Sequence, residues 1–233
     1  MESIDKVRGT FGKRPTEAKD TVSLAVIRRL PRYHRYLGDL LRAGKLRISS
    51  AELAKIMGVT ASQIRQDLNC FGGFGQQGYG YNIKFLHNKI SELLGVNEGF
   101  NAVIIGAGNL GRALAATHMF ERRGVNRLAM FDIDPALIGT EIYGVPVYSV
   151  SELGRFCEEN NVQIGVLTVP KEAAYETTHV MVEAGVRGIW NFANMELKLD
   201  NPDVVVENIH LGDSLMALCY ELKTANEKRN KND

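Results

Sequence analysis

The chain has 233 residues, of which 45% are hydrophobic and 24% charged, and this is the composition of a globular protein with room for one large or two modest domains. No segment approaches the roughly 20 uninterrupted apolar residues of a membrane span, and the polar N-terminus lacks the apolar core of a secretory signal, so we expect a cytoplasmic protein. Three widely spaced cysteines, Cys70, Cys157 and Cys219, fit reduced thiols and predict neither a disulfide framework nor a metal site.

The formal net charge of +1 hides an uneven distribution. Residues 1–95 hold 16 of the 28 Lys and Arg residues but 8 of the 27 Asp and Glu residues, which gives a balance of +8 there and −7 in the remainder. Such asymmetry favours a polyanionic partner for the first part of the chain. The alternative is a basic, solvated surface without a partner.

Two helices are predicted after a polar tail over residues 1–20. Val22–Leu30 carries apolar residues at helical spacing until Pro31 interrupts the pattern, and Tyr33–Ala43 resumes it with the spacing of a buried face. Basic side chains crowd the junction. The candidates for phosphate contacts in this part of the chain are Arg28, Arg29, Arg32 and Lys45.

A helix-turn-helix follows. Ser49 and Glu52 have the spacing of a capping box that begins a helix over Ser50–Met57, and Gly58 fits the position that ends it. A second box at Thr60-Ala61-Ser62-Gln63 begins another helix, which runs to about Asn69. Two helices joined by a short glycine turn have the spacing of a DNA-binding motif.

The exposed face of this second helix carries hydrogen-bonding side chains and no Leu, Ile or Val. Such side chains pair with base edges and phosphates, which favours DNA recognition over a purely structural helical hairpin. We expect Asp67, the exception on this helix, to orient arginine side chains or to cap locally. The candidate DNA contacts of the motif are Ser49, Ser62, Gln63, Arg65 and Gln66.

The segment Phe71–Tyr81 interleaves five glycines with aromatic residues, a pattern that predicts a tight β-hairpin. After a recognition helix, such a hairpin is a wing beside a neighbouring groove, with Gln76 and Gln77 as candidate DNA contacts. A flexible linker is the alternative, although a linker has no need of the aromatic residues. One more helix over Asn82–Leu94 leads to a domain boundary near residue 95.

A dinucleotide-binding fingerprint begins at the next predicted strand. The β-branched run Val103-Ile104-Ile105 enters Gly106-Ala107-Gly108-Asn109-Leu110-Gly111, a G-x-G-x-x-G turn whose glycines permit a tight turn, close approach of a pyrophosphate and helix packing. Asp132 lies 21 residues beyond Gly111 at the end of the next strand, where a carboxylate accepts the ribose hydroxyls of NAD(H) and disfavours the 2′-phosphate of NADP(H). The alternative is a glycine-rich turn in an α/β domain that binds no nucleotide.

Alternating strands and helices continue to about residue 209. The apolar run Val162–Val169 predicts a buried parallel strand that ends at Thr168-Val169-Pro170, at the edge of the sheet where a dinucleotide lies. The strand Gly188–Phe192 brings Asn191 and Phe192 to the same edge, where we expect contact with the nicotinamide.

The segment Leu211–Leu222 is amphipathic, and it follows a completed Rossmann unit. Its apolar stripe packs either on its own domain or on another subunit, and the two-fold dimers formed by many DNA-binding proteins favour the second arrangement. The chain has no room for a substrate domain and no catalytic pair of residues, so we predict that it is not an enzyme and that the nucleotide is a signal.

Across residues 22–222 the chain resembles the Rex family of NADH-sensing transcriptional repressors. The resemblance is carried by Arg28-Arg29-Leu30-Pro31, Ile48–Ala54, Gln63–Leu68, Phe71-Gly72, Gly78–Tyr81, Gly106–Gly111, Phe131–Pro135 and Leu167–Pro170. It implies a homodimer with exchanged C-terminal helices, which binds palindromic operators and leaves DNA when NADH replaces NAD+.

Three positions depart from the family pattern. Gln76-Gln77 stands where many members carry Lys-Arg in the wing. Thr117 replaces a tyrosine, and His210 replaces the aspartate that pairs with it in some members; this pair is tied to switching between two DNA-binding geometries.

We therefore predict an α/β protein with an N-terminal winged helix-turn-helix domain (21–94), a Rossmann NAD(H)-binding domain (95–209), a swapped dimerisation helix (210–226) and a polar tail (227–233). Two alternatives remain open. One is a small NAD(H)-dependent oxidoreductase with a basic interaction domain, and the other is a nucleotide-binding assembly domain with no role in DNA binding.

Overall fold

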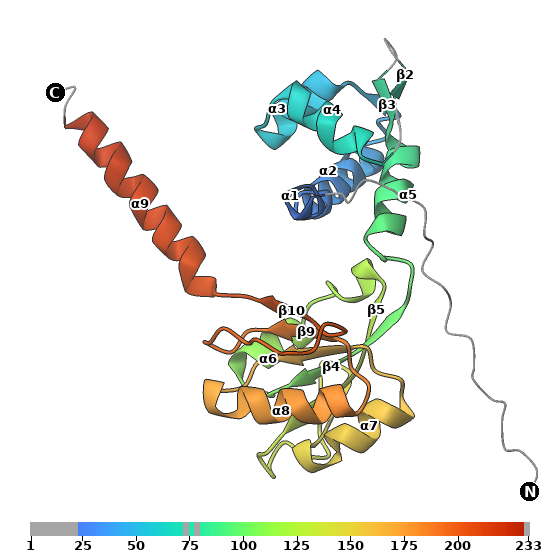
Figure 1. The fold of residues 1–233 in the computed structure, drawn as a ribbon, viewed down its shortest axis with the longest axis vertical. Coiled ribbons are helices and arrows are strands. Elements are labelled where there is room, and N and C mark those ends of the chain that lie inside the picture. Colours follow the sequence, from blue (N-terminus) through green and yellow to red (C-terminus); the bar gives the residue numbers. More distant parts are fainter. Residues whose placement is uncertain (1–22, 72–74, 77–79, 231–233) are drawn as a thin grey trace, which may run out of the picture. The chain divides into compact units, whose positions relative to one another are not determined.

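A computed structural model of the chain describes residues 23–71, 75–76 and 80–230 (Figure 1). The chain divides into two compact units, one up to Leu94 and the other from Gly95 onward. The predicted polar tail over residues 1–20, the wing residue Gln77 and the last three residues lie outside the described ranges.

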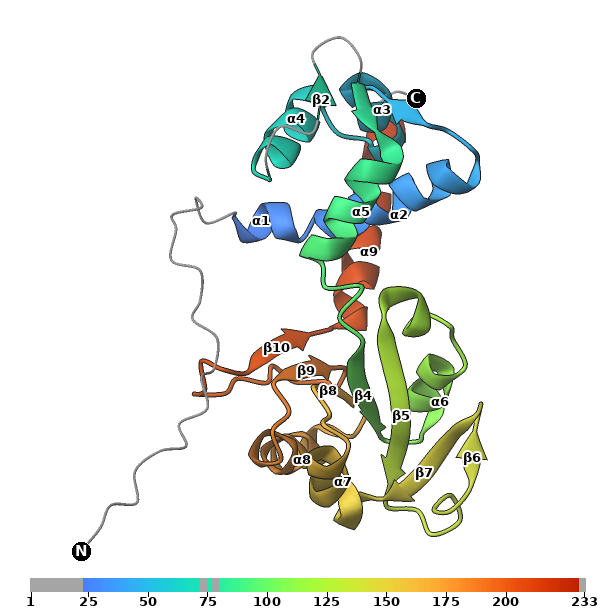
Figure 2. The ribbon, with the colours of Figure 1, turned by 90° about the vertical axis from the view of Figure 1, so that its right-hand side faces the viewer.

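The first unit is helical with one small sheet (Figures 1 and 2). Its sheet has the strand order β1-β3-β2, and both pairings are antiparallel. The helices are α1 (Leu24–Ile27), α2 (Leu30–Arg42), α3 (Ser50–Met57), α4 (Ala61–Asn69) and α5 (Ile83–Leu93), and the strands are β1 (Arg47–Ile48), β2 (Gly75–Gln76) and β3 (Gly80–Asn82).

Most local features of this unit follow from its sequence. Ser49 and Glu52 form the predicted capping box, and Gly58 ends α3 in the left-handed conformation. Pro31 lies in the first turn of α2, where its missing N–H costs no helical hydrogen bond, so α2 begins at Leu30 and not at Tyr33 as predicted. The pairing of β2 with β3 confirms the predicted hairpin.

The second unit is built on a seven-stranded sheet of order β10-β9-β8-β4-β5-β7-β6, parallel throughout except for β6. Taken in chain order, the parallel strands have the 3-2-1-4-5-6 arrangement of a Rossmann fold. The strands are β4 (Phe100–Ile105), β5 (Val125–Asp132), β6 (Glu141–Ile142), β7 (Val145–Ser149), β8 (Ile164–Leu167), β9 (Gly188–Asn191) and β10 (Val205–Asn208).

Helices cover both faces of this sheet (Figure 2). Val103 and Ile105 of β4 face the cluster that contains residues of α7 and α8, whereas Ile104 faces the cluster that contains Ala115 of α6. Burial on both faces explains why the strand sequences are continuously apolar. The helices are α6 (Asn109–Ala115), α7 (Leu153–Glu159) and α8 (Lys171–Glu183), with short 3₁₀ turns η1 (Glu121–Arg123) and η2 (Val150–Glu152).

The last helix, α9 (Leu211–Arg229), buries none of its residues. Leu211, Leu215, Leu218 and Leu222 are each more than half exposed. A helix with such a stripe needs an apolar surface to pack against. Because α9 buries no residue, the structure does not show the helix packed on its own domain, which was the first alternative raised by the sequence.

Candidate nucleotide-binding and nucleic-acid interfaces

The glycine loop after β4 is shaped by two close backbone contacts. Gly106 has φ +100°, and a Cβ there would lie 2.7 Å from the carbonyl oxygen of Thr168. A Cβ on Gly111 would lie 1.9 Å from the carbonyl oxygen of Gly106. Only glycine fits at either position, so these two residues hold the loop, α6 and β8 together.

Gly108 has the opposite surroundings. It precedes α6, whose first turn has no side-chain cap, and a Cβ at this position would meet no atom within 4 Å. The side of the turn that a side chain at Gly108 would occupy is therefore open. This combination, together with the partial positive charge of a helix N-terminus, suits a phosphate group.

Asp132, at the end of β5, is tied to the same loop. Its Oδ2 accepts a hydrogen bond of 2.6 Å from the Ala107 N–H, and its Oδ1 accepts one of 2.9 Å from the Asp134 N–H. Each carboxylate oxygen has two lone pairs, so both can still accept a ribose hydroxyl. The carboxylate thus lies beside the loop as the fingerprint predicts.

Thr168 closes the other side of the loop, just beyond β8. Its hydroxyl lies 2.9 Å from the carbonyl oxygen of Ile105 and 2.8 Å from that of Gly106. Strands β4 and β8 are neighbours at the point where the strand order reverses, and ligands of Rossmann folds bind there. Val169 and Pro170 follow at the same edge and remain predicted contacts.

The side-chain amide of Asn191 has all of its recorded partners inside the unit. The side chain is fully buried; its Nδ2 donates to the Met195 carbonyl and to Asn208 Oδ1, and its Oδ1 accepts from the Ala193 N–H. The side-chain amide is thus part of a polar cluster inside the unit, and a cofactor contact of Asn191 stays a prediction. Phe192 is half-buried with its ring 4.6 Å from that of Trp190, and it stays a prediction.

Arg112 belongs to the site and was missed by the sequence analysis. Its Nε donates a 2.7 Å hydrogen bond to the Ala107 carbonyl, which brings an exposed guanidinium to the glycine loop. A basic residue directly after Gly111 could have indicated this, since a guanidinium pairs well with phosphate oxygens.

On the first unit, α4 presents the predicted polar face. Ser62, Arg65, Gln66 and Asn69 are all exposed, and Arg65 Nη1 donates to Ser50 Oγ of α3 at 3.2 Å. This face is chemically suited to base edges and phosphates.

Asp67 lies on the opposite side of α4 and is fully buried. Its carboxylate accepts hydrogen bonds from Arg29 Nε and Nη2, both 2.7 Å long, from Tyr33 Oη at 2.8 Å and from Gln63 Nε2 at 2.8 Å. Burial by itself raises the pKa of Asp67, but the hydrogen bonds from Arg29, Tyr33 and Gln63 outweigh it and hold the pKa below its usual value. The expectation that Asp67 orients an arginine is confirmed.

The same network corrects a detail of the recognition helix. Thr60 caps α4 as predicted, because its hydroxyl accepts from the Gln63 N–H at 3.1 Å. The Gln63 side chain, however, does not complete the capping box with Thr60. Its Nε2 donates instead to Asp67, which turns the amide toward the buried carboxylate.

Several candidate phosphate contacts have partners within the unit. Arg32 Nη2 donates to the Met57 carbonyl at 2.9 Å, and Lys45 forms a 2.9 Å ion pair with Glu52. Hydrogen bonds from the Ser49 backbone and side chain and from Lys45 lower the pKa of Glu52 to about 2. Arg28 is exposed. All of these residues, and Gln76 in β2, remain predicted rather than demonstrated DNA contacts.

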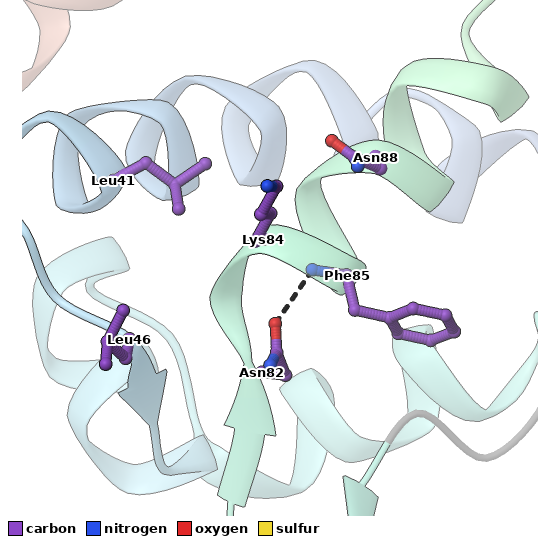
Figure 3. A pocket seen from close by; sticks show the side chains of 6 residues that line it. All are labelled: Leu41, Leu46, Asn82, Lys84, Phe85 and Asn88. Atoms are coloured by element: carbon purple, nitrogen blue, oxygen red, sulfur yellow. Dashed lines mark hydrogen bonds between the residues drawn. The ribbon is translucent and has the colours of Figure 1, made fainter.

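A surface hollow of about 400 Å³ also lies on the first unit (Figure 3). It contains none of the predicted contacts with DNA or nucleotide. Its lining consists of Leu41, Leu46, Asn82, Lys84, Phe85 and Asn88.

None of the helices over residues 23–71, 75–76 and 80–230 combines the length and apolarity that a membrane span requires. No group of three His, Cys, Asp or Glu side chains in those ranges is arranged to hold a metal ion.

A helix-turn-helix unit joined to a Rossmann unit with an open glycine loop is the combination expected of a nucleotide-responsive regulator of transcription. Family models agree with this division. Residues 21–69 match the model described as "Putative DNA-binding protein N-terminus", and residues 97–195 match the one described as "CoA binding domain".

The chain is 52% identical over 89% of its length to the redox-sensing transcriptional repressor Rex of Clostridium botulinum, of which the match covers 99%. It is also 52% identical to the Rex repressor of Thermoanaerobacter sp., with 88% of this chain and 91% of that protein covered. The chain therefore belongs to the Rex family of redox-sensing transcriptional repressors, as its motifs predicted.

Solved structures agree. The crystal structure of RSP in complex with beta-NAD+ and operator DNA matches with a TM-score of 0.83 and 51% identity, over 91% of this chain and 98% of that one. RSP in complex with beta-NADH matches with a TM-score of 0.82 and 48% identity, over 90% of this chain and 98% of that one. The α/β fold and the regulatory, non-enzymatic role predicted from the sequence are confirmed.

Proposed function

We propose that this chain represses transcription by binding palindromic operator DNA through α4 and the β2–β3 hairpin, and that NADH bound at the glycine loop releases it. The observation that supports this most directly is the presence of both surfaces in one chain, the exposed polar face of α4 and the open loop at Gly108. A repressor that monitors NADH against NAD+ in this way works in the cytoplasm.

The nucleotide is NAD(H), in preference to NADP(H) or coenzyme A. The Asp132 carboxylate, fixed by the Ala107 N–H, meets the adenosine ribose in this arrangement. A 2′-phosphate on that ribose, as in NADP(H), or a 3′-phosphate, as in coenzyme A, would bring a second anion against it. Two free hydroxyls are the partner that such a carboxylate favours.

The functional unit is a homodimer held by α9. The exposed leucine stripe of this helix is the surface that a second copy of the chain covers. Replacing Leu215 and Leu218 with Asp places charges in that contact. We expect the variant to sediment as a monomer and to lose operator binding, while the wild-type chain sediments as a dimer.

Release requires that NADH binds one dimer geometry more tightly than the other. A change from mostly bound to mostly free takes roughly 10⁴-fold preference. The tyrosine–aspartate pair found in some relatives is replaced here by Thr117 and His210. The Thr117 hydroxyl donates to the Leu114 carbonyl at 2.8 Å, and His210 Nε2 lies 3.0 Å from Glu196 Oε2. In this chain, therefore, other contacts must distinguish the two geometries.

Fluorescence anisotropy of a labelled operator duplex tests the proposal, with NADH and NAD+ titrated separately. We expect NADH to release the DNA and NAD+ to leave it bound, and Arg65→Ala to weaken binding without changing NADH affinity. DNA that stays bound under both nucleotides would contradict the redox switch. Unchanged duplex affinity in Arg65→Ala would contradict the role of α4.

A further inference from the structure

The side-chain amide of Gln63 is held in a single orientation by Asp67. Gln63 Nε2 lies 2.8 Å from Asp67 Oδ1. An ionised carboxylate only accepts hydrogen bonds, so the amide nitrogen must face Asp67, and the carbonyl oxygen Oε1 must occupy the other position on the amide. The orientation of this amide is thus fixed by chemistry.

The Asp67 carboxylate is itself fixed in position. Its carboxylate is buried and is also anchored by both Arg29 and Tyr33 through three further hydrogen bonds. These partners come from α2 and the residue just before it, so the carboxylate is immobilised by groups outside α4. A buried, fully paired group of this kind imposes its geometry on its neighbours.

Gln63 itself lies in the first turn of α4, between the exposed residues Ser62 and Arg65. In helix-turn-helix proteins the N-terminal residues of the second helix contact base edges in the major groove. Because one N–H of Gln63 Nε2 is engaged with Asp67, the amide cannot flip, and its acceptor Oε1 has a fixed place beside the one remaining N–H. A base that faces Oε1 at that place must therefore present a donor.

We propose that Gln63 is a specificity-determining residue, which accepts a hydrogen bond from the exocyclic amino group of adenine or cytosine, and that Asp67 is the positioning residue that imposes this choice. The inference rests on the proposed function, since it requires α4 in the major groove. Guanine and thymine present acceptors at the corresponding places in that groove, and two facing acceptors repel. A glutamine with a free amide would accommodate either kind of base.

The first experiment uses the full-length protein and an operator duplex selected by it from a random pool. Each adenine is replaced in turn by purine, and each cytosine by 2-pyrimidinone, so that single amino groups are removed. At one position in each half-site, we expect the loss of the amino group to weaken wild-type binding about fivefold to tenfold. At that position Gln63→Ala binds both duplexes equally.

The second experiment reverses the amide. In Asp67→Asn a nitrogen in the place of Oδ1 can donate to Gln63 Oε1, which turns Gln63 Nε2 outward as a donor, with loss of the Arg29 Nη2 hydrogen bond to the same atom. At the position identified above, the preference for adenine or cytosine should then disappear or shift toward guanine or thymine. Circular dichroism and thermal unfolding show whether this variant folds; if it does not, the Gln63→Ala comparison still decides.

Gln66→Ala is the matched control on the same helix. It should weaken binding while keeping the amino-group penalty at the Gln63 position. If Gln63→Ala shows the wild-type penalty at every position, the inference is wrong although the protein binds DNA through α4. If Arg65→Ala leaves affinity unchanged, the proposed function has failed instead, so the two failures are distinguishable.

Discussion

The two units form their candidate sites from different parts of the chain. In the Rossmann unit, the loop from Gly106 to Gly111 offers backbone N–H groups, and its shape depends on positions where a Cβ has no room. In the helix-turn-helix unit, the site consists of side chains on α4, and one of them, Gln63, owes its orientation to the buried Asp67.

This difference determines how each site tolerates change. A backbone site is insensitive to most side chains but fails where a glycine is lost, because nothing else fits the same path. A side-chain site accepts substitutions one residue at a time, but it depends on partners that hold each group in place. Single substitutions in each unit can therefore break or sharpen this contrast.

Gly111→Ala should disrupt the Rossmann unit most severely. The new Cβ would lie 1.9 Å from the Gly106 carbonyl oxygen, so strand, loop and helix must all move. We expect a loss of stability of more than about 3 kcal/mol, measured by urea unfolding of the purified variant.

Gly108→Ala is the matched control in the same loop. Its Cβ meets no atom within 4 Å, and its φ of −73° suits alanine, so the fold should keep its urea midpoint. NADH affinity, measured by titration calorimetry, should nevertheless fall about tenfold or more, because the methyl group occupies the space left for the pyrophosphate. Equal stability losses in the two variants would show that loop shape is not set by these contacts.

Asp67→Asn tests the side-chain half of the comparison. Removing the charge leaves Arg29 without its bidentate partner inside the unit, and we expect a loss of about 2 to 4 kcal/mol in urea unfolding. The exposed Lys45–Glu52 pair supplies the control, since Glu52→Gln retains the acceptor for the Ser49 N–H and should leave the urea midpoint unchanged.

The same variant carries a pH signature. The folded-state pKa of Asp67 lies below its ordinary value of 3.8, so the unfolded chain binds the proton more readily. Its contribution is therefore present above about pH 4 and is lost as the pH falls below 3.8. Asp67→Asn should lack this loss of stability in acid. An acid titration identical to that of the wild type would show that Asp67 does not carry the effect.

What the sequence could predict follows the same division. The glycine loop, the place of Asp132 beside it and the Ser49–Glu52 capping box involve residues near in sequence or at fixed spacing, so their patterns indicated them correctly. Gln63 lies one helical turn before Asp67, but Arg29 and Tyr33 are 38 and 34 residues away from it, and no spacing rule joins them to Asp67. The interior partners of Asn191 were missed for a related reason, because an amide at a strand end has the same sequence pattern whether it faces a ligand or an interior partner such as Asn208.

We expect a smaller pH dependence of stability from the contact between α2 and α5, which includes two histidines. The rings of His34 and His87 are stacked with centroids 4.3 Å apart, and Ser91 Oγ donates to the His87 carbonyl and lies 2.9 Å from His34 Nε2. Burial lowers the pKa of His87 below its ordinary 6.5, and the nearby Arg42 lowers it further, against a hydrogen bond with Asn88 that raises it.

A histidine whose pKa is lowered by folding is protonated more readily in the unfolded chain. The first unit should therefore have its full stability above pH 6.5 and lose some of it as the pH falls below that value. Partial exposure of the ring limits the effect to less than about 1 kcal/mol. Urea unfolding at pH 7.5 and 5.5 measures this change in stability. The Asp67 and Glu52 carboxylates stay ionised in that range, because their pKa values are lowered. His87→Gln should narrow the difference between the two pH values. If the stability difference between the two pH values persists unchanged in His87→Gln, the pH dependence belongs to groups other than the stacked histidine pair.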